Sequence, residues 1–182
     1  VVRSPGGIPV SNIKVEVREQ VSSTIMSYQI TDASGTYSIP LAGGTYKIWV
    51  YGGTAYTGPS NIPMPRLMRI ENIVSNLVVS ANTVQDITLP LVMLSGKTTD
   101  SNGVPVSGVT IRVPYKSWCQ GGPCYYCEND NPPFTVSDAS GNYTMALLSF
   151  SNYSEIVIPP TGSGFAQTVV NGINITHDIL QN

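Results

Sequence analysis

The sequence predicts an all-β protein made of two tandem antiparallel β-sandwich domains. Three observations lead to this prediction: two segments of the chain recur, short runs alternate apolar and polar residues, and glycine, proline, asparagine and aspartate mark the turns between these runs. No stretch of ten residues shows the 3.6-residue period of an amphipathic helix. A length of 182 residues suits one ordinary domain or two small ones, and 41% apolar residues can build a core.

The recurring segments set the domain boundaries. Residues 7–17 (GIPVSNIKVEV) recur as residues 103–113 (GVPVSGVTIRV), and residues 31–39 (TDASGTYSI) recur as residues 137–145 (SDASGNYTM). The second pair is further apart than the first, so the second copy contains an insertion between its two motifs. We therefore predict one sandwich over residues 1–91 and another over residues 92–182, with the insertion at 114–136 containing all three cysteines.

The first copy is predicted to fold as a series of short strands. Residues 13–18 (IKVEVR) alternate apolar with charged side chains, so one face of this strand is expected in water and the other in the core. Residues 32–35 (DASG) are typical of a tight turn, because aspartate can bond the amides of its own turn and glycine supplies a positive φ. Further strands are expected at residues 37–41, 46–50, 67–80 and 84–89.

These motifs resemble a known family. In each copy a G-x-P-V segment leads into an alternating strand, and a [TS]-D-A-S-G-x-Y turn follows; the first copy adds residues 44–46 (GTY), where the second has residues 152–154 (NYS). The pattern resembles the carboxypeptidase regulatory-like domains, relatives of the transthyretin and Cna-B sandwiches, over essentially the whole chain. The resemblance implies Greek-key, prealbumin-like sandwiches that serve as non-catalytic stalks, adhesin repeats, or appendages of secreted enzymes and transporters.

Cna-B relatives often carry an isopeptide bond from a lysine to an asparagine or aspartate beside a buried acid. Lys97, in the first strand of the second copy, is the residue to consider. Alternation places Leu94, Gly96 and Thr98 on one face of that strand and Lys97 on the other, and the family's E-x-x-A-P-x-G-Y stretch is absent. We therefore expect Lys97 to be solvated.

The first strand of the first copy is expected to be incomplete. Aligning Gly7 with Gly103 matches Val1 to Lys97, so the sequence offers nothing to match residues 94–96 (LSG). A sandwich without this part of a strand leaves unpaired backbone groups and an apolar groove. One hypothesis is that subunits complete one another by β-strand addition, which makes a filament when repeated head to tail. The alternative is a strand that is simply short, or one whose first part was lost when the chain was trimmed.

Five residues are candidates for the contact between subunits: Val1, Val2, Arg3, Trp49 and Tyr51. The first three form the remnant of the incomplete strand. Trp49 and Tyr51 point away from the core by the alternation of residues 46–50, and an outward aromatic pair can stack on a sugar ring or meet another subunit. The alternative is that the proline-rich loop 57–66 folds over them.

The insertion predicts a disulfide rather than a metal site. Residues 118–127 (WCQGGPCYYC) place the cysteines at a C-x4-C-x2-C spacing that lacks the second paired half of a zinc site. In an oxidising compartment we expect Cys119 to pair with Cys124 across a tight turn, or with Cys127 as the alternative partner. The remaining cysteine is then a free thiol or bonds another chain.

Three N-x-S/T sequons occur in the second copy, at Asn142, Asn152 and Asn174. They are candidate glycosylation sites if the chain is exported. Because the chain is rich in asparagine, the alternative is that the sequons arise by chance.

Composition excludes several function classes. Only 11% of residues are charged and the net charge is −2, which argues against a nucleic-acid partner, since such proteins need a basic surface. No apolar run reaches the roughly 18–20 residues of a membrane span. No nucleophile has a base beside it in any motif, and Asp32 and Asp138 are best explained as turn formers, so we expect neither an enzyme nor a cofactor.

The sequence thus predicts a non-catalytic, extracellular structural protein of the cell surface. Its expected partner is itself, in a head-to-tail homopolymer assembled by donor-strand addition, with glycans as a further possible ligand. The alternative is a carbohydrate-binding or spacer module of a secreted hydrolase or adhesin.

Overall fold

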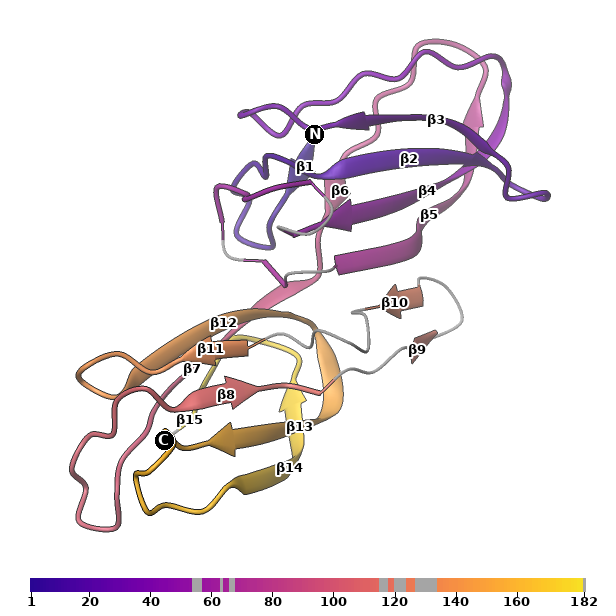
Figure 1. Cartoon of the computed structure of the whole chain (residues 1–182). Coiled ribbons are helices and arrows are strands. Elements are labelled where there is room, and N and C mark those ends of the chain that lie inside the picture. The colour runs from indigo at the N-terminus through magenta and orange to yellow at the C-terminus, as the bar shows by residue number, and fades with distance from the viewer. Residues whose placement is uncertain are drawn as a thin grey trace. The chain divides into compact units, whose positions relative to one another are not determined.

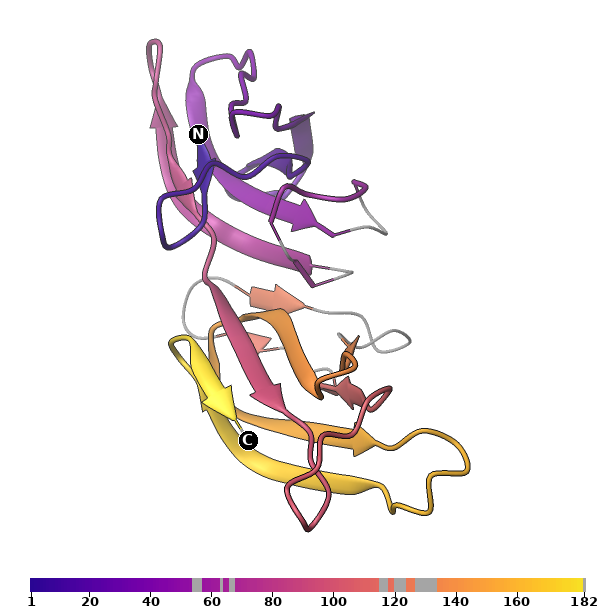
Figure 2. The ribbon, with the colours of Figure 1, turned by 90° about the vertical axis from the view of Figure 1, so that its left-hand side faces the viewer.

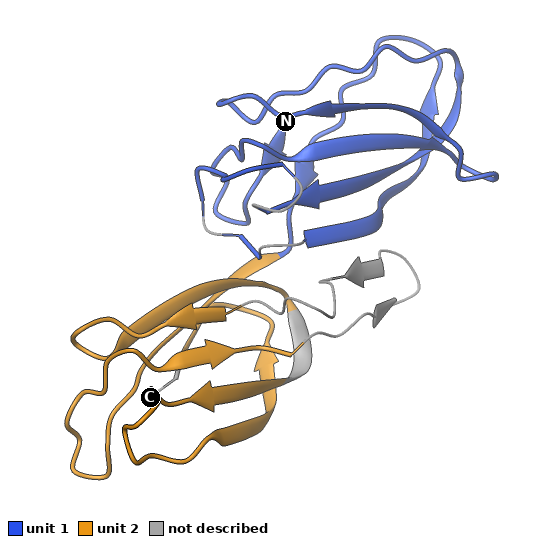
Figure 3. Ribbon diagram, viewed as in Figure 1, with its two compact units in different colours: residues 1–90, 116–128 blue, residues 91–115, 129–182 orange. Residues whose placement is uncertain are grey.

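The computed structural model describes residues 1–53, 57–62, 64–65, 68–114, 118–119, 124–126 and 134–181. These residues form strands and connecting turns without a helix, which confirms the all-β prediction. The chain divides into two compact units (Figure 3): unit 1 comprises Val1–Pro90 and Lys116–Glu128, and unit 2 comprises Leu91–Tyr115 and Asn129–Asn182. The sequence-based division lies one residue from this boundary, but the structure groups residues 116–128 of the insertion with unit 1.

Unit 1 is built from two sheets. Its strands are β1 (Val2–Arg3), β2 (Lys14–Glu19), β3 (Ile25–Ile30), β4 (Gly44–Gly52), β5 (Met68–Val79), β6 (Ile87–Thr88), β9 (Trp118–Cys119) and β10 (Cys124–Tyr126). The larger sheet has the order β3-β2-β4-β5-β10-β9, and β1 pairs with β6 in the smaller one (Figure 1). The alternation of β2 and β4 buries Val15, Val17, Ile48 and Val50 on the inner face, as their period of two requires.

Unit 2 repeats this plan with a fuller second sheet. Its strands are β7 (Leu91–Lys97), β8 (Thr110–Arg112), β11 (Phe134–Val136), β12 (Asn142–Leu148), β13 (Phe150–Ile158), β14 (Thr168–Ile175) and β15 (Ile179–Gln181). The sheets have the orders β11-β8-β13-β14 and β12-β7-β15. Figure 2 shows the C-terminal strand β15, in yellow, alongside β7, to which it is parallel.

The two aspartate turns form as predicted. Asp32 Oδ1 accepts hydrogen bonds from the backbone amides of Ser34 (2.8 Å) and Thr36 (2.9 Å). Asp138 makes the same two bonds, to Ser140 (2.8 Å) and Asn142 (2.9 Å). The Ser34 hydroxyl and these amides lower the pKa of Asp32, because they stabilise its charged form. Both aspartates are turn formers, as the sequence indicated.

One predicted strand of unit 1 is not a strand. Residues 37–41 alternate Tyr, Ile and Leu, yet the structure assigns no strand there, whereas the equivalent residues of unit 2 form β12. The physical reason is the neighbouring strand. The whole of β12 is hydrogen-bonded to β7, whereas none of the described strands of unit 1 lies in the corresponding position. Residues 37–41 therefore have the side-chain alternation of a β-strand but not the backbone hydrogen bonds to a neighbouring strand.

Candidate functional site

The N-terminal edge of unit 1 is closed by the chain's own residues. The Val2 amide donates to the Gly35 carbonyl (2.8 Å), the Ile87 amide donates to the Val1 carbonyl (2.9 Å), and the Val2 side chain is fully buried. Val2 and Arg3, which the sequence analysis names with Val1 as candidates for the contact between subunits, are thus paired within unit 1, because β6 pairs with β1 in parallel. These three residues therefore lie within the fold of unit 1, and the unfilled part of the sheet lies beside them.

Next to β1, unit 1 contains a groove of about 950 Å³. One wall is residues 36–41, which includes the segment predicted as a strand, and the opposite wall is residues 81–86. Val17, Ile48 and Leu77 from the large sheet also line it. The groove thus lies between these two segments, over apolar side chains of the inner face of the large sheet.

The same position in unit 2 is filled by β7. The repeat matches residues 36–41 to residues 142–147 of β12. The register of β1 with β6 and of β7 with β15 matches residues 83–85 to residues 179–181 of β15. In unit 2, β12 and β15 are both hydrogen-bonded to β7, which lies between them. A backbone hydrogen bond beside the groove is also repeated. The Thr98 amide donates to the Gly141 carbonyl (2.9 Å), as the Val2 amide donates to the Gly35 carbonyl. The groove of unit 1 is therefore the space that a strand occupies in unit 2.

Tyr37 spans the end of the groove near β1. Its hydroxyl donates to the backbone carbonyl of Gln85 on the opposite wall (2.5 Å). Burial raises the pKa of Tyr37 to about 12, and the nearby negative charge of Asp86 adds to the effect. The phenol therefore stays protonated at neutral pH and donates to a carbonyl at the groove's edge.

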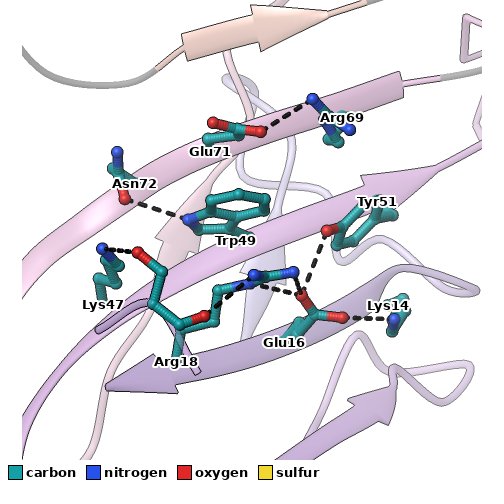
Figure 4. Close-up of polar contacts among 10 residues, drawn as sticks. Lys14, Glu16, Arg18, Lys47, Trp49, Tyr51, Arg69, Glu71 and Asn72 are labelled. Atoms are coloured by element: carbon teal, nitrogen blue, oxygen red, sulfur yellow. Dashed lines mark hydrogen bonds and ion pairs between the residues drawn. The ribbon is translucent and has the colours of Figure 1, made fainter. Parts of the chain in front are cut away.

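The outer face of the large sheet carries the predicted aromatic pair (Figure 4). Trp49 and Tyr51 point away from the core, as their alternation in β4 requires, and both are half-buried. The Arg18 guanidinium lies 3.8 Å from the centre of the Trp49 ring, and the indole N–H donates to Asn72 Oδ1 (3.0 Å). The Lys14 ammonium lies 4.8 Å from the centre of the Tyr51 ring. Each ring is thus covered by a cation from the same sheet.

Glu16 lies at the centre of this face and is only 1% exposed, although the sequence places it on the wet side of β2. Its carboxylate is bound by Lys14 Nζ (2.5 Å) and Arg18 Nη2 (2.6 Å), and the Tyr51 hydroxyl donates to it at 3.2 Å. Burial alone would raise the pKa of Glu16, but the hydrogen bonds and charges of Lys14 and Arg18 outweigh it and lower this pKa. The alternation correctly placed Glu16 on the outer face of the sheet. It did not predict that the long side chains of neighbouring residues bury Glu16 there.

The remaining predicted residues are placed as follows. The side chains of Asn142 and Asn174 are exposed, and that of Asn152 lies outside the described residues. The strands β9 and β10 place Cys119 opposite Cys124 in antiparallel register, and Cys127 lies outside the described residues. Lys97 is exposed at the end of β7, in agreement with a solvated lysine.

The described part of the chain contains neither a metal-binding cluster nor a membrane-spanning helix. None of its residues gather into a cluster of three or more His, Cys, Asp or Glu that could hold a metal ion. Within the same residues, no helix is long and apolar enough to cross a membrane.

Comparison with known proteins gives only distant similarities. No family model matches the chain, and no curated protein matches it. Among solved structures, it is similar to the shaft pilin spaA from Lactobacillus rhamnosus GG, with 11% identity, a TM-score of 0.44, and coverage of 96% of this chain and 89% of that one. It is also similar to GBS52, the minor pilin of Streptococcus agalactiae, with 14% identity, a TM-score of 0.37, and coverage of 96% and 82%.

The remnant strand, residues 1–3, is predicted from the sequence to be part of the contact between subunits. Of these three residues Val1 lines the groove, together with residues 36–41 and 81–86. The two walls are identified only when the alignment of Val1 with Lys97 is combined with the strands that pair with β7 in the structure.

Proposed function

We propose that this chain is a non-catalytic structural protein of the cell exterior, the subunit of a cell-surface filament or appendage that assembles by β-strand addition. The observation that carries the proposal is the groove of unit 1, which has the position of a strand in unit 2 and is occupied by none of the strands that the structure describes. The low content of charged residues, 11%, fits a surface that is polar through hydroxyl and amide groups, as is common outside cells.

The groove favours association because none of the described strands pairs with its two walls. An added strand supplies backbone hydrogen bonds to the walls while it covers apolar side chains. When the strand comes from a neighbouring subunit, donor and acceptor surfaces differ, so the contact is heterologous. Repeated from subunit to subunit, a heterologous contact gives an open filament.

Placing a charge in the groove is expected to abolish assembly. Ile39 is half-buried in one wall, and Ile39→Asp introduces a carboxylate that an entering apolar strand must desolvate. We expect filaments of the wild type in electron micrographs of concentrated protein, and monomers of the variant. The matched control is Val21→Asp, because Val21 is 88% exposed on a turn outside the groove. A wild type that stays monomeric at high concentration contradicts the proposal.

The alternative, a carbohydrate-binding or spacer module, depends on the aromatic pair of β4. Trp49 is the residue on which a sugar ring would stack, but the Arg18 guanidinium already covers its ring at 3.8 Å. Retention of the monomeric wild type on polysaccharide, lost in Trp49→Ala, is the result that favours this alternative. The exposed Asn142 and Asn174 remain candidate glycosylation sites of an exported protein.

We also propose a disulfide between Cys119 and Cys124. Opposite residues of antiparallel strands have Cα atoms about 4.5–5.5 Å apart, inside the range of about 4.4–6.8 Å that disulfides require. Titration of the unfolded, unreduced protein with a thiol reagent is expected to find one free thiol among the three cysteines. In Cys127→Ser none is expected, and three free thiols in oxidised wild-type protein contradict the pairing.

A further inference from the structure

We infer that the edge strand β3 of unit 1 pairs with β3 of a second copy of this chain, antiparallel and centred on Tyr28. β3 is the outermost strand of the large sheet, and β2 is its only partner among the described strands (Figure 1). None of its residues lines the groove. The contact therefore goes beyond the proposed function and does not depend on it.

Alternate residues of β3 direct their backbone N–H and C=O groups away from the sheet. The Thr31 amide donates to the Ile13 carbonyl (2.8 Å), and this pair continues the register of β2 with β3. Because bonded and non-bonded pairs alternate along an antiparallel ladder, Tyr28 and Ile30 direct their backbone groups away from β2. None of the described strands pairs with that side of β3, so another strand can bond to it.

β3 lacks the features that usually keep an exposed edge from pairing. Natural edge strands are often very short, charged or interrupted by proline. β3 has six residues (IMSYQI), none of which is charged or proline. The bulge between β2 and β3 lies at the start of β3 and leaves Ser27–Ile30 in regular register. The apolar side chains of β3 are 45–59% exposed: Ile25, Met26, Tyr28 and Ile30.

A second β3 fits this edge because the strand is complementary to itself. In an antiparallel pair centred on Tyr28, outward-directed residues of the two copies lie opposite each other and exchange backbone hydrogen bonds. Tyr28 then faces Tyr28, and Met26 faces Ile30, so aromatic and apolar side chains meet their own kind. The polar Ser27 faces the polar Gln29. Both copies present the same surface, so the contact is isologous and closes with two copies.

The charges at the two ends of β3 favour the same arrangement. Just before β3, Lys47 Nζ donates to Ser23 Oγ (2.6 Å) and Arg18 Nη1 donates to the Ser23 carbonyl (3.0 Å). Lys47 forms no ion pair with a described residue, although Glu19 is near enough to interact with its charge. Just after β3, Asp32 is exposed and uses only Oδ1 in its turn. Antiparallel pairing brings this carboxylate beside the cations of the other copy, at both ends of the contact.

The pair is expected to exchange rapidly, so the test traps it with a disulfide. A contact of one short strand from each copy is smaller than the roughly 1,200–2,000 Å² of a stable interface. Opposite residues of a non-hydrogen-bonded antiparallel pair have Cα atoms about 4.5 Å apart, within reach of a disulfide. The pair of Ser27 with Gln29 of the other copy is of this kind, because neither directs its backbone groups outward.

The experiment mixes two variants, Ser27→Cys and Gln29→Cys, under mild oxidation. Both also carry Cys127→Ser, which removes the thiol that the proposed disulfide leaves free. We expect about ten-fold more disulfide-linked dimer from the mixture than from either variant alone, because neither position faces itself. Non-reducing gels, compared with reduced ones and with the parent Cys127→Ser, measure this difference. Equal amounts from the mixture and from each variant alone would overturn the register.

Amide exchange tests the pairing without a cross-link. The amides of Tyr28 and Ile30 should exchange about three-fold or more slowly in concentrated than in dilute protein, because the second copy bonds to them. Ile30→Lys should remove this dependence, since a lysine must be desolvated opposite Met26. The matched control Val104→Lys, on an exposed turn of unit 2, should retain it. Exchange rates that do not change with concentration in the wild type would overturn the pairing.

Ile39→Asp separates this contact from the filament. The substitution lies in the groove and is expected to remove filaments, but it should leave both the cross-linking and the exchange results unchanged. If both readouts disappear with the filaments, β3 does not pair independently and the inference is overturned. If wild-type protein forms no filaments but both readouts are observed, the β3 contact holds and the filament proposal fails.

Discussion

Replacing Gly141 with alanine is expected to destabilise unit 2 by about 3 kcal/mol or more. Gly141 has a φ of +77°, and a Cβ atom there would lie 2.5 Å from the Thr98 carbonyl oxygen. That oxygen accepts the hydrogen bond of the Val106 amide (2.9 Å), and the Thr98 amide donates to Gly141 itself. The substitution therefore adds backbone strain and also forces apart the segments around Thr98 and Gly141 that are hydrogen-bonded at this end of the sandwich.

Gly103 provides the matched control. Its φ of +79° is nearly the same, but a Cβ atom there meets nothing within 4 Å. Gly103→Ala should therefore cost only the left-handed backbone strain, about 1–2 kcal/mol. Urea unfolding, followed by amide exchange of each unit separately, measures both variants. Equal losses in the two variants would show that the contact with Thr98 contributes nothing.

Local patterns predicted most of the strands because side-chain alternation is a local property. Residues 13–18 and 46–50 form β2 and β4 with the predicted inner faces, and the aspartate turns form where the motifs stand. The exposed edge strand β3 was not anticipated, since Ile25–Ile30 mixes apolar and polar residues without strict alternation and is mostly exposed.

The candidate site could not be read in the same way because it depends on neighbours that are distant in sequence. Residues 37–41 have the pattern of a strand, and only the pairing of the whole sheet shows that no strand lies beside them. Glu16 alternates as a solvent-facing residue, and its burial comes from Lys14, Arg18 and Tyr51 on its own and the adjacent strand. Strand pairing and the burial of a side chain by its neighbours depend on the tertiary structure, so the sequence of one strand does not determine them.

A buried acid in unit 2 is expected to make stability fall as the pH rises. Glu155 is 1% exposed on β13, at the position that Ile48 occupies on β4. Its Oε1 accepts a hydrogen bond from Tyr143 (3.2 Å), and Oε2 has no partner among the described residues. Burial raises the pKa of Glu155, and the bond from Tyr143 offsets this only in part.

The sign follows from proton linkage. A carboxyl group whose folded pKa lies above its unfolded value binds its proton more tightly in the folded state. Its contribution is fully present below the unfolded pKa, near 4.5, and is lost as the pH rises through the folded pKa. Between those two values the loss is about 1.4 kcal/mol for each pH unit. Glu155→Gln removes this slope, so the variant should be the more stable protein at pH 8 and no more stable at pH 4.

Glu16 in unit 1 has the opposite effect on how stability depends on pH, so it serves as the control for Glu155. Its folded pKa is lowered, so its contribution is present above the unfolded pKa and is lost as the pH falls through the folded one. Glu16→Gln should lower the free energy of unfolding by about 1–3 kcal/mol at pH 7, because Lys14 and Arg18 lose their counter-charge. The stability of the variant should also fall less steeply than that of the wild type as the pH is lowered. Melting curves from pH 3 to pH 9, with amide exchange to distinguish the units, measure both variants. Destabilisation of Glu155→Gln at every pH would mean that the Glu155 carboxylate is favourably paired, and the two acids would then not act in opposite directions.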